Sequence, residues 1–167
     1  MHVDVIPTLI DQYRETFEGE VRPGMCWIVD GRRDAALLGT LQPLTAPQAF
    51  APPVPGARPL AAHVAHLRFA LDLTLRRLNG ENPDADWPGS FELGDDASPP
   101  AWDRLRRDLR AAYDGVLAFL EQRRDAPPQD WPPIHLVGLT ATIAHNAYHL
   151  AAIRQIAQVV RHRPASS

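Results

Sequence analysis

The sequence contains no lysine, a single cysteine and no long apolar run, and each absence excludes something. All 17 basic side chains are arginines, and the formal net charge of −3 provides no strong positive field for binding nucleic acid. The lone Cys26 cannot form an internal disulfide, so we expect a reducing compartment. No run approaches the roughly 18 apolar residues of a membrane span. The N-terminal segment mixes charged residues into its apolar positions, unlike a secretory signal. We therefore expect a cytoplasmic protein that binds neither membranes nor nucleic acids.

The length of 167 residues and the apolar content of 45% predict one globular domain over residues 1–167. Apolar side chains recur at spacings of three and four, which is typical of helices that bury one face. The segments with this pattern are residues 6–18, 60–79, 98–122 and 134–161. No segment alternates over strand length, so the chain is predicted to be all-α.

Two long connections separate the predicted helices. Residues 20–58 hold six prolines, which exclude long helices there and leave room only for short helical turns near 34–38 and 46–51. Residues 81–99 are rich in proline, glycine and aspartate, and a shorter proline-rich loop, residues 126–133, precedes the last helix. Four amphipathic helices with long connections after the first and second predict a four-helix bundle.

The last predicted helix carries His145 and His149, four residues apart. At 3.6 residues per turn, these side chains lie on one face, at the edge of the apolar arc, where they can share a metal ion with a neighbouring helix. The spacing by itself is weak evidence, because such a pair also arises by chance and a core histidine is often satisfied by a backbone carbonyl. No glutamate follows His145, so the HExxH motif of zinc peptidases is absent.

The second predicted helix carries His63 and His66 on the side away from its charged residues. An unpaired buried imidazole costs free energy, so histidines on two inward faces indicate a shared partner. Three imidazoles with an open fourth position are typical of a catalytic zinc-type site, and imidazole ligands also suit nickel, iron and copper. The spacing does not choose between His63 and His66, and it does not decide whether His135 takes part.

Several stretches together resemble one known family. Trp27 is followed by residues 35–39 (AALLG) and 44–49 (LTAPQA), and the second helix begins within residues 55–67 (PGARPLAAHVAHL). Residues 84–90 (DADWPGS) form a less specific loop, and residues 143–156 (IAHNAYHLAAIRQI) form the most specific stretch. Through most of its length the chain resembles the DinB/YfiT-like superfamily of metal-binding four-helix bundles.

This resemblance implies a metal site formed by His66, His145 and His149. In the family, the ligand of the second helix is followed by an apolar residue, as His66 is here, which makes His63 a neighbour that supports a ligand or lines the pocket. The sequence departs from the family pattern at positions 151 and 152, where two alanines replace a frequent Gly-Gln pair. The ligands are intact, and any role of that glutamine is not carried over.

Known activities of the superfamily include metal-dependent transfer of low-molecular-weight thiols and isomerisation of related substrates. The resemblance therefore implies a bound divalent metal ion, with zinc and nickel as the first candidates and iron and copper as alternatives. It also implies a transferase acting on a thiol such as bacillithiol, mycothiol or glutathione and on an electrophile. Arg68 and Arg154 are candidates to hold substrate carboxylates. The alternatives are a non-catalytic, stress-associated metal-binding protein and a metal-dependent hydrolase, for which no carboxylate is clearly placed as general base.

Three further expectations concern surfaces and the thiol. The outer face of the last helix has small side chains suited to close packing in a homodimer: Ala144, Ala147, Ala151 and Gln158. The run Arg104, Arg106, Arg107 and Arg110 is expected to form a solvated face. Cys26 is expected to be a small packed residue beside Trp27 instead of a reactive thiol.

Overall fold

A computed structural model describes residues 5–162, apart from the side chains of Arg33 and Pro128, and every regular element within them is helical. The α-helices are α1 (Val5–Glu18), α2 (Leu37–Leu41), α3 (Ala46–Phe50), α4 (Leu60–Leu78), α5 (Pro99–Glu121) and α6 (Pro133–Arg161). Three 3₁₀ turns accompany them, η1 (Arg33–Ala35), η2 (Gly89–Phe91) and η3 (Pro128–Asp130). The prediction of an all-α protein is confirmed for this part of the chain. No helix in the described residues is long and apolar enough to cross a bilayer.

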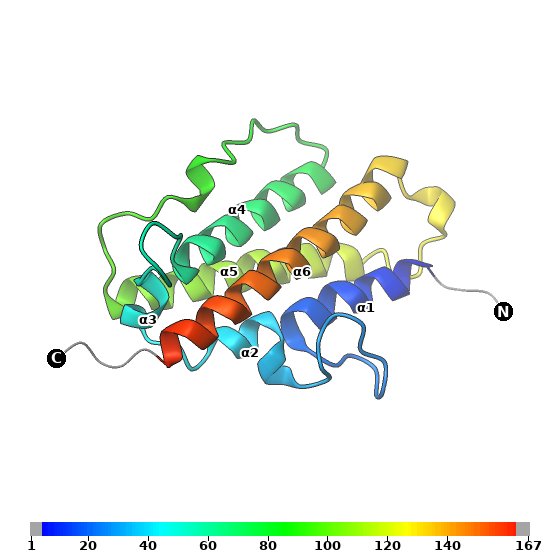
Figure 1. Cartoon of the computed structure of the whole chain (residues 1–167). Coiled ribbons are helices and arrows are strands. Elements are labelled where there is room, and N and C mark those ends of the chain that lie inside the picture. Colours follow the sequence, from blue (N-terminus) through cyan, green and yellow to red (C-terminus); the bar gives the residue numbers. More distant parts are fainter. Residues whose placement is uncertain (1–4, 163–167) are drawn as a thin grey trace.

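The four long helices lie side by side around one hydrophobic core, to which all six α-helices contribute buried side chains (Figure 1). Helix α4 packs on both α5 and α6, and α1 packs on α6 and α5. Helices α4 and α5 run in the same direction, whereas α6 runs antiparallel to both (Figure 1). Since α4 and α5 are parallel, the loop between them travels back along α4 before α5 begins. This return path places residues of the loop beside the first half of α4.

Local sequence signals set the helix ends. The side chain of Ser98 accepts a hydrogen bond from the backbone N–H of Ala101 (3.4 Å) and caps α5. Gly80, with φ +86°, follows the end of α4, where a left-handed residue favours glycine. Pro59 lies just outside the first turn of α4 and is the extended residue at its N-cap. Pro133 begins α6, one residue earlier than predicted, because a proline in the first turn needs no N–H partner.

The connection between α1 and α4 contains the two short helices. The turn expected near residues 34–38 is divided into η1 and α2, so its α-helical part begins at Leu37 and extends to Leu41. The turn expected near 46–51 is confirmed as α3, where the backbone N–H of Thr45 donates to Oε1 of Gln48 (3.0 Å). Both helices bury apolar side chains in the shared core, which fixes this proline-rich segment against the long helices.

A buried carboxylate fastens the first part of the same connection. Glu15 of α1 is only 3% exposed. Its Oε1 accepts hydrogen bonds from the backbone N–H groups of Trp27 (2.7 Å), Ile28 (2.6 Å) and Val29 (3.0 Å). A buried charge of this kind is tolerated only when hydrogen bonds replace its hydration. Glu15 therefore gives three loop amides the partner that a helix or sheet would otherwise supply.

Candidate metal centre

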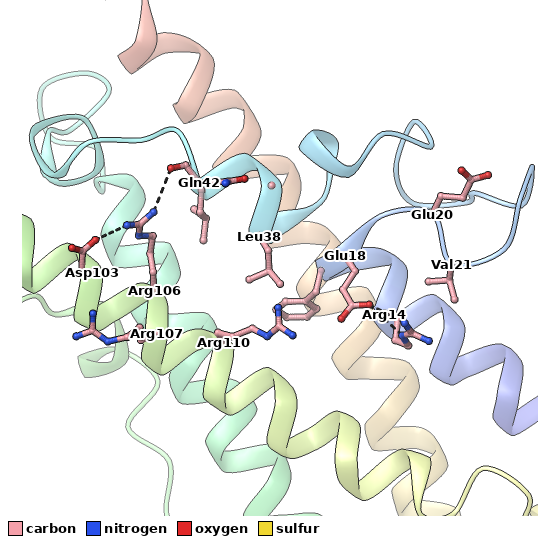
Figure 2. A pocket seen from close by; sticks show the side chains of 13 residues that line it. Arg14, Glu18, Glu20, Val21, Leu38, Gln42, Asp103, Arg106, Arg107 and Arg110 are labelled. Carbon is pink, nitrogen blue, oxygen red and sulfur yellow. Dashed lines mark hydrogen bonds and ion pairs between the residues drawn. The ribbon is translucent and has the colours of Figure 1, made fainter.

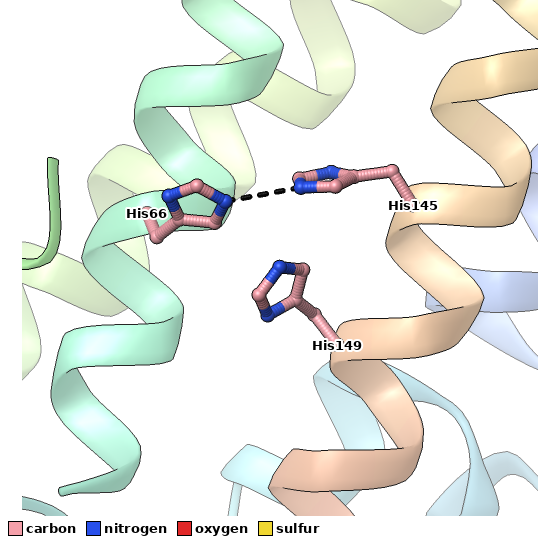
Figure 3. A group of neighbouring side chains, drawn as sticks. All are labelled: His66, His145 and His149. Atoms are coloured by element: carbon pink, nitrogen blue, oxygen red, sulfur yellow. Dashed lines mark hydrogen bonds between the residues drawn. The ribbon is translucent and has the colours of Figure 1, made fainter. Parts of the chain in front are cut away.

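Three histidines from two helices converge at one point. His66 comes from α4, and His145 and His149 come from successive turns of α6 (Figure 3). One ring nitrogen from each lies within 4.8 Å of the others, and Nε2 of His66 lies 3.0 Å from Nε2 of His145. A tetrahedral ion with metal–nitrogen distances of about 2.0–2.1 Å holds its ligand nitrogens roughly 3.3 Å apart. The cluster therefore has the dimensions of a three-imidazole metal site.

The antiparallel packing of α4 and α6 produces this convergence. His145 and His149 lie one turn apart on the face of α6 that meets α4, and His66 of α4 points toward His145 with His149 beside the pair (Figure 3). His66 and His149 are buried, whereas His145 is partly exposed. The cluster therefore reaches solvent on the side of His145.

His63 lies one turn before His66 on α4 and contacts His149 of α6. Its Nδ1 lies 3.1 Å from Nδ1 of His149, so Nε2 is the nitrogen of His149 that points toward the other two rings (Figure 3). A neutral imidazole that keeps the lone pair on Nε2 carries its hydrogen on Nδ1. His149 in that form donates to His63. The contact places His63 behind one of the three histidines, and its role as a residue that supports a ligand stays a prediction.

A serine of the returning loop fixes His66. Oγ of Ser90 lies 2.6 Å from Nδ1 of His66 and 2.6 Å from the carbonyl oxygen of Trp87. The carbonyl can only accept, so the single hydroxyl hydrogen of Ser90 goes to Trp87, and Nδ1 of His66 donates to Ser90. This assigns the hydrogen of His66 to Nδ1 and leaves a free lone pair on Nε2, the atom that faces His145.

Aromatic rings of the same loop cover the site. The ring of Phe91 stacks on His66 with a centroid distance of 3.9 Å and an interplanar angle of 9°. Trp87 lies 5.8 Å from His66 and 6.4 Å from His145, between ring centroids. The guanidinium of Arg58 lies 4.3 Å from the centre of the Phe91 ring. These contacts restrict the orientation of His66 and reduce its contact with water.

Burial keeps the imidazoles neutral. Loss of hydration, followed by the charges of neighbouring histidines, lowers the pKa of His149 to about 3 and that of His66 to about 4. Burial also lowers the pKa of His145, and burial together with Arg58 lowers that of His63. A neutral imidazole is the form that binds a metal ion. The donor set, its convergence and its protonation state thus fit a divalent cation.

The other candidate residues lie in different surroundings. Arg68 forms an ion pair with Asp72 (2.7 Å) on α4, and Arg154 forms one with Asp30 (2.9 Å) of the α1–α4 connection. Their predicted role in holding substrate carboxylates stays a prediction. His135 lies ten residues before His145 on α6, about 15 Å along the axis, and its ring meets the edge of Phe119.

Cys26 is partly buried. Partial loss of hydration, followed by the charges of Glu15 and Glu20, raises the pKa of its thiol. A raised pKa disfavours the thiolate, the reactive form of cysteine. Trp27 beside it is 76% exposed, so the two do not form the packed pair that we expected.

A separate hollow of about 850 Å³ lies between α1, α2 and α5 and is lined by four arginines (Figure 2). Arg14 pairs with Glu18 (3.0 Å), Arg106 with Asp103 (2.5 Å) and Arg110 with Asp114 (2.9 Å). These ion pairs are all within α1 or α5, and they neutralise the charge of three of the four arginines. The arrangement agrees with the solvated face expected for this run.

The fold and the site define an all-helical protein with a histidine cluster of metal-binding geometry. The chain belongs to the DinB superfamily, whose family model matches residues 31–155. The matched segment contains all three clustered histidines as well as His63 and Ser90. No curated protein and no solved structure matches the chain.

Replacing Ser90 with alanine is expected to weaken zinc binding by about 10- to 100-fold, because the groups that orient a ligating histidine have effects of this size. Ser90→Thr keeps the hydroxyl and should retain most of the affinity. Competition with a chromogenic chelator of known affinity measures both variants. Equal affinities of the wild type and Ser90→Ala would show that the hydroxyl does not orient His66.

Proposed function

We propose that this protein is a divalent-metal-binding member of the DinB superfamily, in which a four-helix bundle holds one ion between His66, His145 and His149. The observation that carries the proposal is the convergence of three neutral imidazoles from α4 and α6, with the outer nitrogens of His66 and His149 engaged by Ser90 and His63. Supporting hydrogen bonds of this kind accompany ligating histidines in metal sites. Imidazole ligands favour zinc or nickel, with iron and copper as alternatives.

We propose further that the site is catalytic and acts on a low-molecular-weight thiol. A bound divalent ion lowers the pKa of a coordinated thiol and favours the thiolate. The three histidines occupy one side of the site, and the partial exposure of His145 provides access for a small molecule. Phe91 and Trp87 exclude water from the remaining sides, which strengthens electrostatic interactions within the site.

A screen of thiols with electrophilic acceptors tests the catalytic proposal. Bacillithiol, mycothiol and glutathione would each be incubated with an electrophilic aromatic acceptor and the zinc- or nickel-loaded protein. Turnover that disappears on chelation and in His149→Ala would support a transferase. A protein that binds the metal stoichiometrically and turns over no thiol is instead a non-catalytic metal-binding protein or a hydrolase, and hydrolysis of ester substrates separates these two.

We also propose that the protein forms a homodimer through the outer face of α6. Ile134 (72%), Val137 (64%) and Tyr148 (71%) are exposed there, in line with the exposed small residues Ala144 and Ala151. Large exposed apolar side chains at helical spacing are typical of an interface. Tyr148→Arg should weaken the dimer at least tenfold, because a buried aromatic near the centre of an interface contributes about 2 kcal/mol. Sedimentation equilibrium measures the effect, and a monomeric wild type would refute the dimer.

A further inference from the structure

A groove of about 710 Å³ extends from the metal centre along the space between α4 and α6. Its volume is that of a small-molecule site, and its lining is mainly apolar. The second half of α4, the turn after it and the first half of α6 form the walls, and His145 and Trp87 close one end. Its lining includes Thr74 and Arg77 of α4 and Gly138, Ala141, Thr142 and His145 of α6.

The groove is open because the facing positions carry small residues. Gly138 lies inside α6, and a Cβ added there would meet no atom within 4 Å. A glycine within a helix costs about 1 kcal/mol relative to alanine, and no close approach of another element requires one at this position. Ala70 and Ala141 also leave space, and the hydroxyls of Thr74 and Thr142 lie only 3.4 Å apart across the floor. The small side chains preserve a cavity that larger ones would fill.

The end of the groove away from His145 carries a positive charge. Arg77 lies eleven residues after His66 on α4, about 16 Å along the helix axis. The neighbouring Arg76 pairs with Glu81 (2.7 Å), so the carboxylate at this end is already neutralised. Among residues 5–162, Arg77 has no carboxylate partner within ion-pair distance. An anion bound beside it would gain an interaction without breaking one.

We infer that this groove binds an extended molecule that is apolar except for a carboxylate at one end. The carboxylate lies beside Arg77, and the other end of the molecule lies at His145. The apolar walls would cover a hydrocarbon chain or a linked ring system. The length of the groove separates Arg77, at the charged end, from the histidine cluster at the other end. This inference builds on the proposed function, since it names the class of molecule that meets the metal-bound thiol. The binding itself requires only the groove.

Decanoate and decanol are suitable probes, because they share a hydrocarbon chain and differ in charge. Binding is measured by calorimetry on metal-free protein, since a carboxylate also coordinates divalent ions. We expect decanoate to bind the wild type and to bind Arg77→Gln about tenfold more weakly, which is the effect of losing one charge-assisted hydrogen bond. Decanol binding should be the same in both proteins. Arg107→Gln, which removes an arginine from the other hollow, should leave decanoate binding unchanged.

Filling the groove provides an independent variant. Gly138→Leu should weaken the binding of both probes at least tenfold, whereas Gly138→Ala should bind them as the wild type does. Both variants replace a helical glycine and are expected to melt at or above the wild-type temperature. Ala141→Leu replaces Gly138→Leu if the latter does not fold. Decanoate that does not bind, or that binds Gly138→Leu and the wild type equally, overturns the inference.

The His66→Ala variant separates this inference from the proposed function. It should lose the metal and retain decanoate binding. A wild-type protein that holds the metal but does not bind decanoate would overturn the inference about the groove and leave the proposed metal site standing. A wild-type protein that binds decanoate but holds no stoichiometric metal would overturn the proposed metal site and leave the inference about the groove standing.

Discussion

Replacing His66 with alanine is expected to abolish stoichiometric zinc binding, with a loss of affinity greater than 100-fold. The variant retains only the two imidazoles of α6, and removing a ligand costs more than the 10- to 100-fold effect of removing a supporting group. His149→Ala should behave in the same way, because His149 completes the convergence and contacts His63. Elemental analysis of protein dialysed against zinc gives the stoichiometry, and competition with a chelator gives the affinity.

Thermal melting provides the second measurement. An ion that binds the folded protein much more tightly than the unfolded chain stabilises the folded protein by up to about 2.7 kcal/mol at a free concentration of 100 times Kd. The wild type should therefore melt at a higher temperature with zinc than with chelator, and the two variants should show no such difference. His135→Ala is the matched control, because it removes a histidine from the same helix, outside the cluster, and should keep both the metal and the stabilisation. A His66→Ala variant with full zinc content would contradict the three-histidine site.

Replacing Glu15 with alanine is expected to lower the free energy of unfolding by about 2–3 kcal/mol. The substitution removes the acceptor of three backbone N–H groups, of which that of Val29 is buried and those of Trp27 and Ile28 are partly buried. Leaving a buried donor without a partner costs about 1–3 kcal/mol, and a partly buried donor costs less because water can replace the lost acceptor. Domains of this kind have total stabilities of about 5–15 kcal/mol, so the loss is a large part of the whole. Urea denaturation followed by circular dichroism measures the change.

Two comparisons show whether the loss comes from these hydrogen bonds. Glu15→Gln keeps a side-chain oxygen of the same length and should lose less than half as much. Glu18→Gln removes a carboxylate from the same helix, where it pairs with Arg14 in a partly exposed ion pair. Such surface pairs contribute about 0–1 kcal/mol. If Glu15→Ala is no more destabilising than Glu18→Gln, the buried carboxylate does not anchor the connection.

Helical periodicity was sufficient to predict the four long helices. The four long helices were predicted to within one or two residues at each end, since capping residues such as Ser98 and stop residues such as Gly80 act locally. Pro59 shows the limit of these signals. A proline fits both the cap and the first turn of a helix, and only the extended backbone on its N-terminal side distinguishes the two.

The sequence predicted the three candidate metal ligands with different degrees of support. His145 and His149 are linked by the period of a single helix, so their shared face follows from spacing. His66 required knowledge of how a second helix packs, and the family resemblance provided it. Their convergence depends on the antiparallel contact of α4 with α6, which no local pattern contains.

Two other residues, Ser90 and Glu15, were not identified from the sequence. Ser90 reaches His66 across 24 positions because the loop after α4 turns back along that helix. Glu15 lies in an amphipathic helix and looks like any surface glutamate, although its partners lie 12 to 14 positions away. Both contacts arise from the path of irregular segments, and proline and glycine content predicts that such segments exist without predicting where they go.

The separation of His66 from His145 by 79 positions has a consequence for folding. The pair on α6 forms as soon as one helical turn forms, so an unfolded chain already presents two local ligands. The third ligand arrives only when α6 docks on α4, after the large loop between them has closed and lost its entropy. The ion binds the three-histidine site of the docked helix more tightly than the two-histidine pair of the undocked helix. The ratio of these two affinities is the factor by which a bound ion favours docking. Metal availability should thus shift the equilibrium between the undocked and the docked last helix toward the docked form.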